Sequence, residues 1–163
     1  MTEMAPVKMT YREACRQAIR EAILAEPRVS LMREDVARYG VFLAGCLGLD
    51  PELRDTIRVA GLLHDVGKTQ LALDLIRKPG TLTVEEFEEI KKHPEEGYAI
   101  LGKMTHIQES TRSVVREHHM RFDRTGYPRP EPEYRINPHS HIIAVADCYD
   151  ALTTMRSYQR ARF

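Results

Sequence analysis

Two pairs of adjacent polar residues, His64-Asp65 and His118-His119, interrupt segments that otherwise have the pattern of apolar helices. Burying such pairs is costly unless something binds them, and a metal ion is the simplest partner. Helix ends and helix faces along the sequence supply the following candidate ligands: His64, Asp65, His93, His118, His119 and Asp147. A mixed set of imidazoles and carboxylates suits iron, manganese, zinc or cobalt better than calcium or magnesium.

The chemistry that such a set could support is hydrolysis of a phosphodiester. Two metals about 3.5–4 Å apart, bridged by a carboxylate and a water, would lower the pKa of that water and neutralise the phosphodiester oxygens. In-line attack by the resulting hydroxide would then expel the ribose 3′ oxygen. A phosphate ligand also needs local positive charge, which the following residues supply if the fold gathers them: Lys68, Arg121, Arg124, Arg129, Arg156 and Arg160.

The elements that must position these side chains are predicted to be helices throughout, because no segment alternates with the period of a strand. Long helices are expected at 10–25, 30–47, 107–119 and 139–154, and another from Pro51 to the His64-Asp65 pair; shorter ones are expected at 71–77, at 83–92 and from His93 onward. Asp50 and Thr83 are expected to cap the helices that follow them. The segment 120–138 contains four prolines and is predicted to be a long loop, which in a compact domain is usually functional or disordered.

Composition limits the classes of partner and compartment. The chain has 163 residues, 42% apolar, with 24 Lys plus Arg against 24 Asp plus Glu. This balance argues against a nucleic acid polymer as the partner. The three cysteines are widely spaced and predict reduced thiols in a cytoplasmic protein. No apolar run has the length of a membrane span, and no signal-peptide pattern opens the sequence, so no membrane association is expected.

Over roughly residues 28–160 the sequence resembles the HD-GYP family, a group of HD-superfamily metal-dependent phosphodiesterases. The resemblance rests on His64-Asp65, His93-Pro94-Glu95-Glu96-Gly97, His118-His119 and Gly126-Tyr127-Pro128, and on Asp147 within Asp147-Cys148-Tyr149-Asp150. It implies an all-α helical bundle with a metal centre in its core and a long proline-rich Gly-Tyr-Pro loop. Residues 1–27 would be an N-terminal helix or linker. Residues 28–163 would form the phosphohydrolase domain, which ends earlier than is usual in the family.

The resemblance also implies roles. Members of the family hydrolyse cyclic di-GMP, here to pGpG and on to GMP. Asp65 would bridge two metals, iron or manganese, with zinc, cobalt or nickel as alternatives. One metal would be held by Asp65, His93, His118 and His119, and the other by His64, Asp65 and Asp147. Catalysis would fall to Asp65 and Lys68, and contacts to a cyclic dinucleotide to Lys68, Arg156, Tyr127 and Gly126.

The sequence departs from the family at Met32, where most members carry a further histidine ligand. Met120 and Arg124 also replace residues that are usually acidic and small. Met32 favours a second function, a degenerate domain that binds a nucleotide or a partner protein without catalysis. A third, an HD-type nucleotidohydrolase, is disfavoured by the histidine pair and the Gly-Tyr-Pro loop. A homodimer and a regulatory or GGDEF-type protein partner are also left open.

Five polar residues near these motifs have simpler interpretations. His106, His139 and His141 belong to no motif and are expected to be surface or core histidines. Asp123 is expected to cap the loop or to pair with an arginine. Asp150 shares a helix face with Asp147, and is expected to support that residue by hydrogen bonding.

Overall fold

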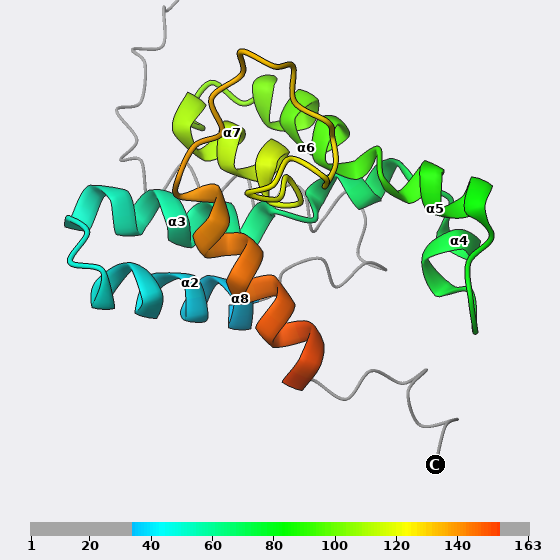
Figure 1. Ribbon diagram of the computed structural model, residues 1–163, viewed down its shortest axis with the longest axis horizontal. Helices are drawn as coiled ribbons and strands as arrows, with labels where there is room; N and C mark the ends of the chain where they lie inside the picture. Colours follow the sequence, from blue (N-terminus) through cyan, green and yellow to red (C-terminus); the bar gives the residue numbers. More distant parts are fainter. Residues whose placement is uncertain (1–33, 154–163) are drawn as a thin grey trace, which may run out of the picture.

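The computed structural model describes residues 34–153, and every regular element among them is a helix (Figure 1). The helices are α2 (Glu34–Cys46), α3 (Pro51–Leu63), the 3-10 helix η1 (Val66–Gln70), α4 (Leu73–Arg77), α5 (Val84–Ile90), α6 (His93–Gly102), α7 (Glu109–Glu117) and α8 (Ser140–Thr153). The all-α prediction is confirmed. The predicted helix at 10–25, and also Met32, Arg156 and Arg160, lie outside the described residues.

A bundle forms because each long helix buries one apolar face. Helices α2 and α3 pack side by side, and α8 packs against both (Figure 1). Helix α6 packs against η1 and α7, and α7 also packs against α3. Their shared core contains Val36, Ala44, Ile57, Val59, Leu101, Val114, Val115 and Ile143, all 0% exposed. Each fully buried valine, isoleucine or leucine contributes about 1.5–3 kcal/mol relative to an exposed one. Helices α4 and α5 extend from one end of this bundle (Figure 1).

Local capping explains why α3 and α5 begin where the sequence predicted. Asp50 accepts a hydrogen bond from the backbone N–H of Leu53 at 2.9 Å, and Pro51 occupies the first helical position. Thr83 accepts from the N–H of Glu86 at 3.2 Å, and the Glu86 carboxylate accepts from the Thr83 N–H at 2.7 Å. Both predicted caps are confirmed, and the second is a complete capping box.

The loop 120–138 is confirmed as a segment without helix, and its own hydrogen bonds order it. Asp123 accepts hydrogen bonds from the N–H and the hydroxyl of Thr125 at 3.0 and 2.6 Å, and lies 3.9 Å from Arg121, as predicted for a loop cap. Arg124 has φ of 64°, a left-handed conformation that is strained for a side-chain-bearing residue. Its guanidinium donates to the carbonyl oxygens of Pro132 and Tyr134, which compensates for that strain.

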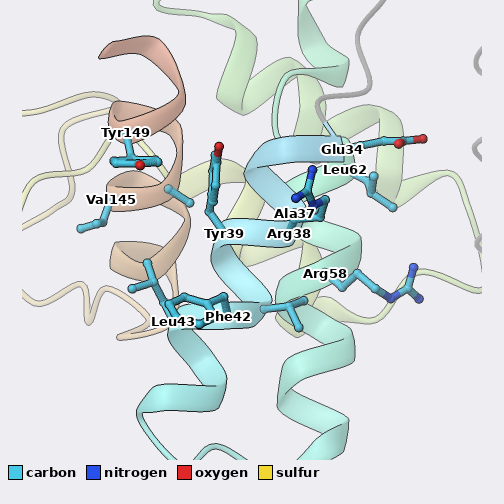
Figure 2. Close-up of a pocket in the computed structure, with 12 residues that line it drawn as sticks. Glu34, Ala37, Arg38, Tyr39, Phe42, Leu43, Arg58, Leu62, Val145 and Tyr149 are labelled. Carbon is cyan, nitrogen blue, oxygen red and sulfur yellow. The ribbon is translucent and has the colours of Figure 1, made fainter. Parts of the chain in front are cut away.

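An apolar groove of about 980 Å³ lies between α2, α3 and α8 (Figure 2). Phe42, Val145 and Tyr149 line it and are 69%, 56% and 52% exposed. None of the candidate ligands lines this groove, so it is distinct from the predicted metal centre. Within the described residues, no helix combines the length and apolar character needed to cross a membrane.

Candidate metal centre

Five of the six candidate ligands lie at helix ends that meet inside the bundle, and the sixth lies within a helix. His64 and Asp65 follow the last residue of α3, and His93 is the first residue of α6. His118 and His119 follow the last residue of α7, while Asp147 projects from the middle of α8. His64, His93 and His118 are at most 1% exposed, and Asp65 is 5% exposed. These residues are remote in sequence but buried close together, which is the convergence that their order and spacing predicted.

Asp65 stands between two groups of these side chains. Its Oδ1 atom lies 3.4 Å from Nε2 of His93, which is itself 3.3 Å from Nε2 of His118. The ligating atoms of His93, His118 and His119 all lie within 4.8 Å of one another. On the other side, Nε2 of His64 lies 3.5 Å from Oδ2 of Asp65 and 3.7 Å from Oδ1 of Asp147. The two oxygens of Asp65 thus face different groups, which is the arrangement that a bridging carboxylate requires.

Short-range hydrogen bonds set the tautomers of three histidines. The Nδ1–H groups of His64, His93 and His118 donate to the carbonyl oxygens of Gly61, Ile90 and Val115 at 2.7, 2.8 and 2.6 Å. Because a carbonyl oxygen can only accept, each Nδ1 carries the proton, and each Nε2 is left with its lone pair directed inward. In the described part of the chain, Nε2 of His64 and Oδ1 of Asp65 are buried without a hydrogen-bond partner. A divalent metal ion would satisfy both atoms, so the donor set fits such an ion.

The protonation states favour metal binding. Burial, opposed by the charge of Asp65, lowers the pKa of His93 to about 4. Burial and neighbouring imidazoles also lower the pKa of His118 and of His119, so these rings are neutral at pH 7. Burial alone would raise the pKa of Asp65, but the charges of His64 and Lys68 outweigh it and hold that pKa well below its usual range. Burial alone would lower the pKa of His64, but the carboxylates of Asp65 and Asp147 outweigh it and raise that pKa. The site therefore offers the neutral imidazoles of His93, His118 and His119 around an ionised carboxylate, the forms in which both groups bind metals.

Lys68 reaches the centre from η1. Its Nζ donates to Oδ2 of Asp65 at 2.7 Å, and its side chain is 27% exposed. Gly67 makes this approach feasible, since a Cβ atom there would overlap the carbonyl oxygen of His93 and lie 2.6 Å from the backbone nitrogen of Gly97. A side chain at position 67 would therefore push η1 away from α6.

The Gly-Tyr-Pro segment folds back onto the centre. The Tyr127 N–H donates to the carbonyl oxygen of His119 at 3.0 Å, and the Tyr127 ring lies 4.5 Å from the His119 ring. A Cβ atom at Gly126 would overlap that same carbonyl oxygen and lie 2.7 Å from the backbone nitrogen of Arg121. Burial, with the charges of Asp65 and Asp147, raises the pKa of Tyr127, so its phenol remains a hydrogen-bond donor.

The other histidines and Asp150 take different positions. His106 is exposed, whereas His139 and His141 are half-buried. In the described part of the chain, none of these three belongs to the cluster formed by the ligating atoms of His93, His118 and His119. Asp150 is buried at 2% exposure. Its predicted support of Asp147 stays a prediction.

Glu117 is a structural residue that the sequence reading missed. It is 2% exposed, and its carboxylate accepts hydrogen bonds from the Tyr134 hydroxyl at 2.6 Å and from the Asn137 N–H and the Ser140 hydroxyl at 2.7 Å each. Glu117 thus joins the end of α7, which precedes the histidine pair, to the start of α8. Its signal in the sequence was a carboxylate in the last turn of a helix, where the helix dipole disfavours negative charge.

Glu117→Gln is expected to lower the melting temperature. The amide keeps the shape of the carboxylate, but its NH2 group would face a donor and leave buried polar groups unpaired, at a cost of about 1–3 kcal/mol. Thermal unfolding checks this, with Glu95→Gln as control because Glu95 is 56% exposed and meets Arg116 only at 3.4 Å. Equal melting temperatures for the two variants would contradict the role given to Glu117.

A helical bundle that gathers histidines from helix ends and a second aspartate from α8 around one carboxylate defines the class: a metal-binding domain of the HD type. A model of the family described as "HD domain" matches residues 16–162. The chain belongs to this family, and the predicted membership in its HD-GYP group is confirmed.

Relatives with assigned activities support the same grouping. The cyclic di-GMP phosphodiesterase response regulator RpfG of Xanthomonas campestris is 32% identical over 162 residues, which cover 99% of this chain and 43% of that protein. A cyclic di-GMP phosphodiesterase of Thermotoga maritima is 36% identical over 117 residues, covering 71% of this chain and 32% of that protein. The 3'3'-cGAMP-specific phosphodiesterase 3 of Vibrio cholerae is 32% identical over 157 residues, covering 96% of this chain and 34% of that protein. The chain thus spans less than half the length of each of these relatives.

Proposed function

We propose that this chain is a metal-dependent phosphodiesterase that hydrolyses cyclic di-GMP to pGpG and on to GMP. The observation that carries the proposal is the position of Asp65, whose two oxygens face two separate groups of buried ligands. A site with one bridging carboxylate suits two metal ions acting on one phosphodiester. The relatives named as cyclic di-GMP phosphodiesterases support this choice of substrate.

Each residue of the candidate centre has a proposed role in metal binding or in contacts to the substrate. Asp65, His93, His118 and His119 would hold one ion, and His64, Asp65 and Asp147 the other, with iron or manganese best suited to this mixture. When bound, the ions supply a nucleophilic water at neutral pH and neutralise phosphodiester charge. The ammonium of Lys68, beside Asp65 and partly exposed, would donate to a phosphate oxygen. The phenol of Tyr127 would donate a hydrogen bond from the loop side, next to Gly126. Arg156 is a further proposed phosphate contact.

The test is to purify the chain without added metal, measure its metal content, and follow hydrolysis of cyclic di-GMP by separating the products. Two metal ions per chain and the appearance of pGpG are expected. Turnover of mononucleotides alone would favour an HD-type nucleotidohydrolase. Absence of both metal and turnover, even after reconstitution with Fe(II) or Mn(II), would favour a binding domain without catalysis.

Hydrolysis of 3'3'-cGAMP is the second candidate activity. Three of the similar proteins of Vibrio cholerae carry the name 3'3'-cGAMP-specific phosphodiesterase, which favours it. The same assay with this substrate compares the two activities, because the ratio of kcat/KM values measures the preference directly.

Met32→His is expected to raise metal affinity by roughly 10–100-fold, the range by which residues around a metal site alter it. Met32 aligns with the position where the family supplies an imidazole, so the substitution would add a protein ligand to the ion held by His64 and Asp147. Titration of Mn(II) into the apo protein, wild type against variant, measures this. An unchanged affinity would mean that the alignment of the segment around Met32 is wrong.

Cytoplasmic location, a homodimer, a regulatory or GGDEF-type partner and the boundary between residues 27 and 28 stay predictions from the sequence.

A further inference from the structure

Phe122 is the most exposed large apolar side chain among the described residues, at 88%. Single apolar side chains on a surface need no explanation, but the position of this one is unusual. Of the exposed large apolar residues that the structure describes, it alone lies in the segment between His119 and Tyr127. An aromatic ring thus faces solvent within the loop that folds back onto the candidate metal centre.

The segment around Phe122 is held close to that centre. Phe122 lies three positions after His119, so their Cα atoms are at most about 11 Å apart. The chain then turns back, since the Arg124 N–H donates to the Arg121 carbonyl oxygen at 2.8 Å and the Tyr127 N–H donates to that of His119 at 3.0 Å. Phe122 therefore protrudes from a closed turn beside the histidine pair.

A second aromatic ring supports Phe122. The ring of His141, in the first turn of α8, lies 5.9 Å from the Phe122 ring with an interplanar angle of 64°. This edge-to-face contact is a favourable aromatic geometry, and it orients one ring against the helix that carries Asp147. The other face of the Phe122 ring remains open to solvent, as its exposure requires.

An exposed aromatic face beside a phosphodiester site is suited to a nucleobase. Stacking of a base on an aromatic side chain contributes about 1–3 kcal/mol, and the adjacent cation of Arg121, which is 71% exposed, can strengthen it. We infer that Phe122, supported by His141, is a stacking platform for one nucleobase of the cyclic dinucleotide bound at the metal centre. This inference rests on the proposed function, and it concerns binding of the base, while the chemistry stays with the metal ligands.

The test separates base recognition from phosphodiester chemistry by using two substrates. Cyclic di-GMP carries bases, whereas bis(p-nitrophenyl) phosphate carries none and depends on the metal centre. In the metal-loaded chain, Phe122→Ala is expected to raise KM for cyclic di-GMP roughly 5- to 150-fold, the equivalent of the stacking energy. Its kcat with that substrate should stay within about twofold, and its kcat/KM with bis(p-nitrophenyl) phosphate should be unchanged.

Two further variants control the experiment. Phe122→Tyr keeps the stacking face and should have the wild-type KM for cyclic di-GMP. Phe42→Ala removes an exposed phenyl ring that lines the apolar groove and should leave the kinetic constants for both substrates unchanged. An unchanged KM for cyclic di-GMP in Phe122→Ala, or an equal loss with both substrates, would overturn the inference and leave the proposed function standing. Failure of the wild type to hydrolyse either substrate would reject the proposed function, and the inference with it.

Discussion

Asp65→Asn is expected to remove bound metal almost completely, whereas Asp147→Asn should leave part of it in place. Asp65 faces His93 with one oxygen and His64 with the other, so its charge serves both proposed ions. Among the described ligands, Asp147 lies 3.7 Å from Nε2 of His64, and its side chain is 20% exposed. Phosphodiesterase activity of Asp65→Asn should fall by more than about 100-fold, because even residues that only support metal ligands cost 10–100-fold when replaced.

Metal analysis of purified variants, with metal expressed per chain, measures this difference. Asparagine preserves the volume of aspartate, and circular dichroism will show whether the helices persist. Asp123→Asn is the matched control, since Asp123 is 57% exposed in the loop and, among the described residues, its carboxylate pairs with Arg121 and Thr125. Equal metal loss in Asp65→Asn and Asp147→Asn would contradict the bridging role of Asp65.

Gly67→Ala is expected to destabilise the chain strongly and to lower its metal content. The added methyl group would overlap the carbonyl oxygen of His93 and lie 2.6 Å from the backbone nitrogen of Gly97. Backbone atoms of a packed helix cannot move aside cheaply, so η1 and α6 must separate, at a cost of at least about 1–3 kcal/mol. Asp65 and Lys68 lie close to Gly67 at the start of η1, whereas His93 is the first residue of α6. A separation of η1 from α6 would therefore increase the distance between Asp65 and His93 and weaken metal binding.

Gly102→Ala is the matched control for this substitution. Gly102 is the last residue of α6, and the nearest atoms to a Cβ atom there would be those of the Arg112 guanidinium, at an ordinary 3.6 Å. Alanine is favoured over glycine within a helix by up to about 1 kcal/mol, so Gly102→Ala should leave stability unchanged or slightly raised. Chemical denaturation of both variants, with metal analysis, makes the comparison. Similar free energies of unfolding would show that η1 and α6 can adjust.

Where elements begin was predictable from the sequence because the signals are short-ranged. Asp50 and Thr83 bond to backbone groups three residues ahead, so their residue types already predict α3 and α5. The end of α7 was predicted less well. The helix stops at Glu117, two residues before the expected limit, and the Met120 N–H donates to the Glu117 carbonyl oxygen at 2.6 Å in a tight turn. The histidine pair therefore lies on the turn that follows the helix.

The candidate site was predicted in part. The order and types of His64, Asp65, His93, His118, His119 and Asp147, matched to a family, were sufficient to select them. Even the orientation of three imidazoles is local, because each Nδ1–H bonds to a carbonyl oxygen three residues earlier in the chain. By contrast, the contact of Lys68 with Asp65 also depends on Gly67 allowing η1 to approach α6, which the spacing of residues does not reveal.

By itself, the sequence determined the helical class, the helix caps, the loop and the set of chemically active side chains, because these depend on residue type and on neighbours within about four positions. Only the tertiary structure decided that the two oxygens of Asp65 face separate ligand groups, and that Glu117 joins α7 to α8 across 17 to 23 positions of sequence. Both depend on how helices pack, and packing is set by the shapes of buried surfaces that are distant in the chain. Side-chain types can specify which groups are available, but their mutual distances arise only when the core closes.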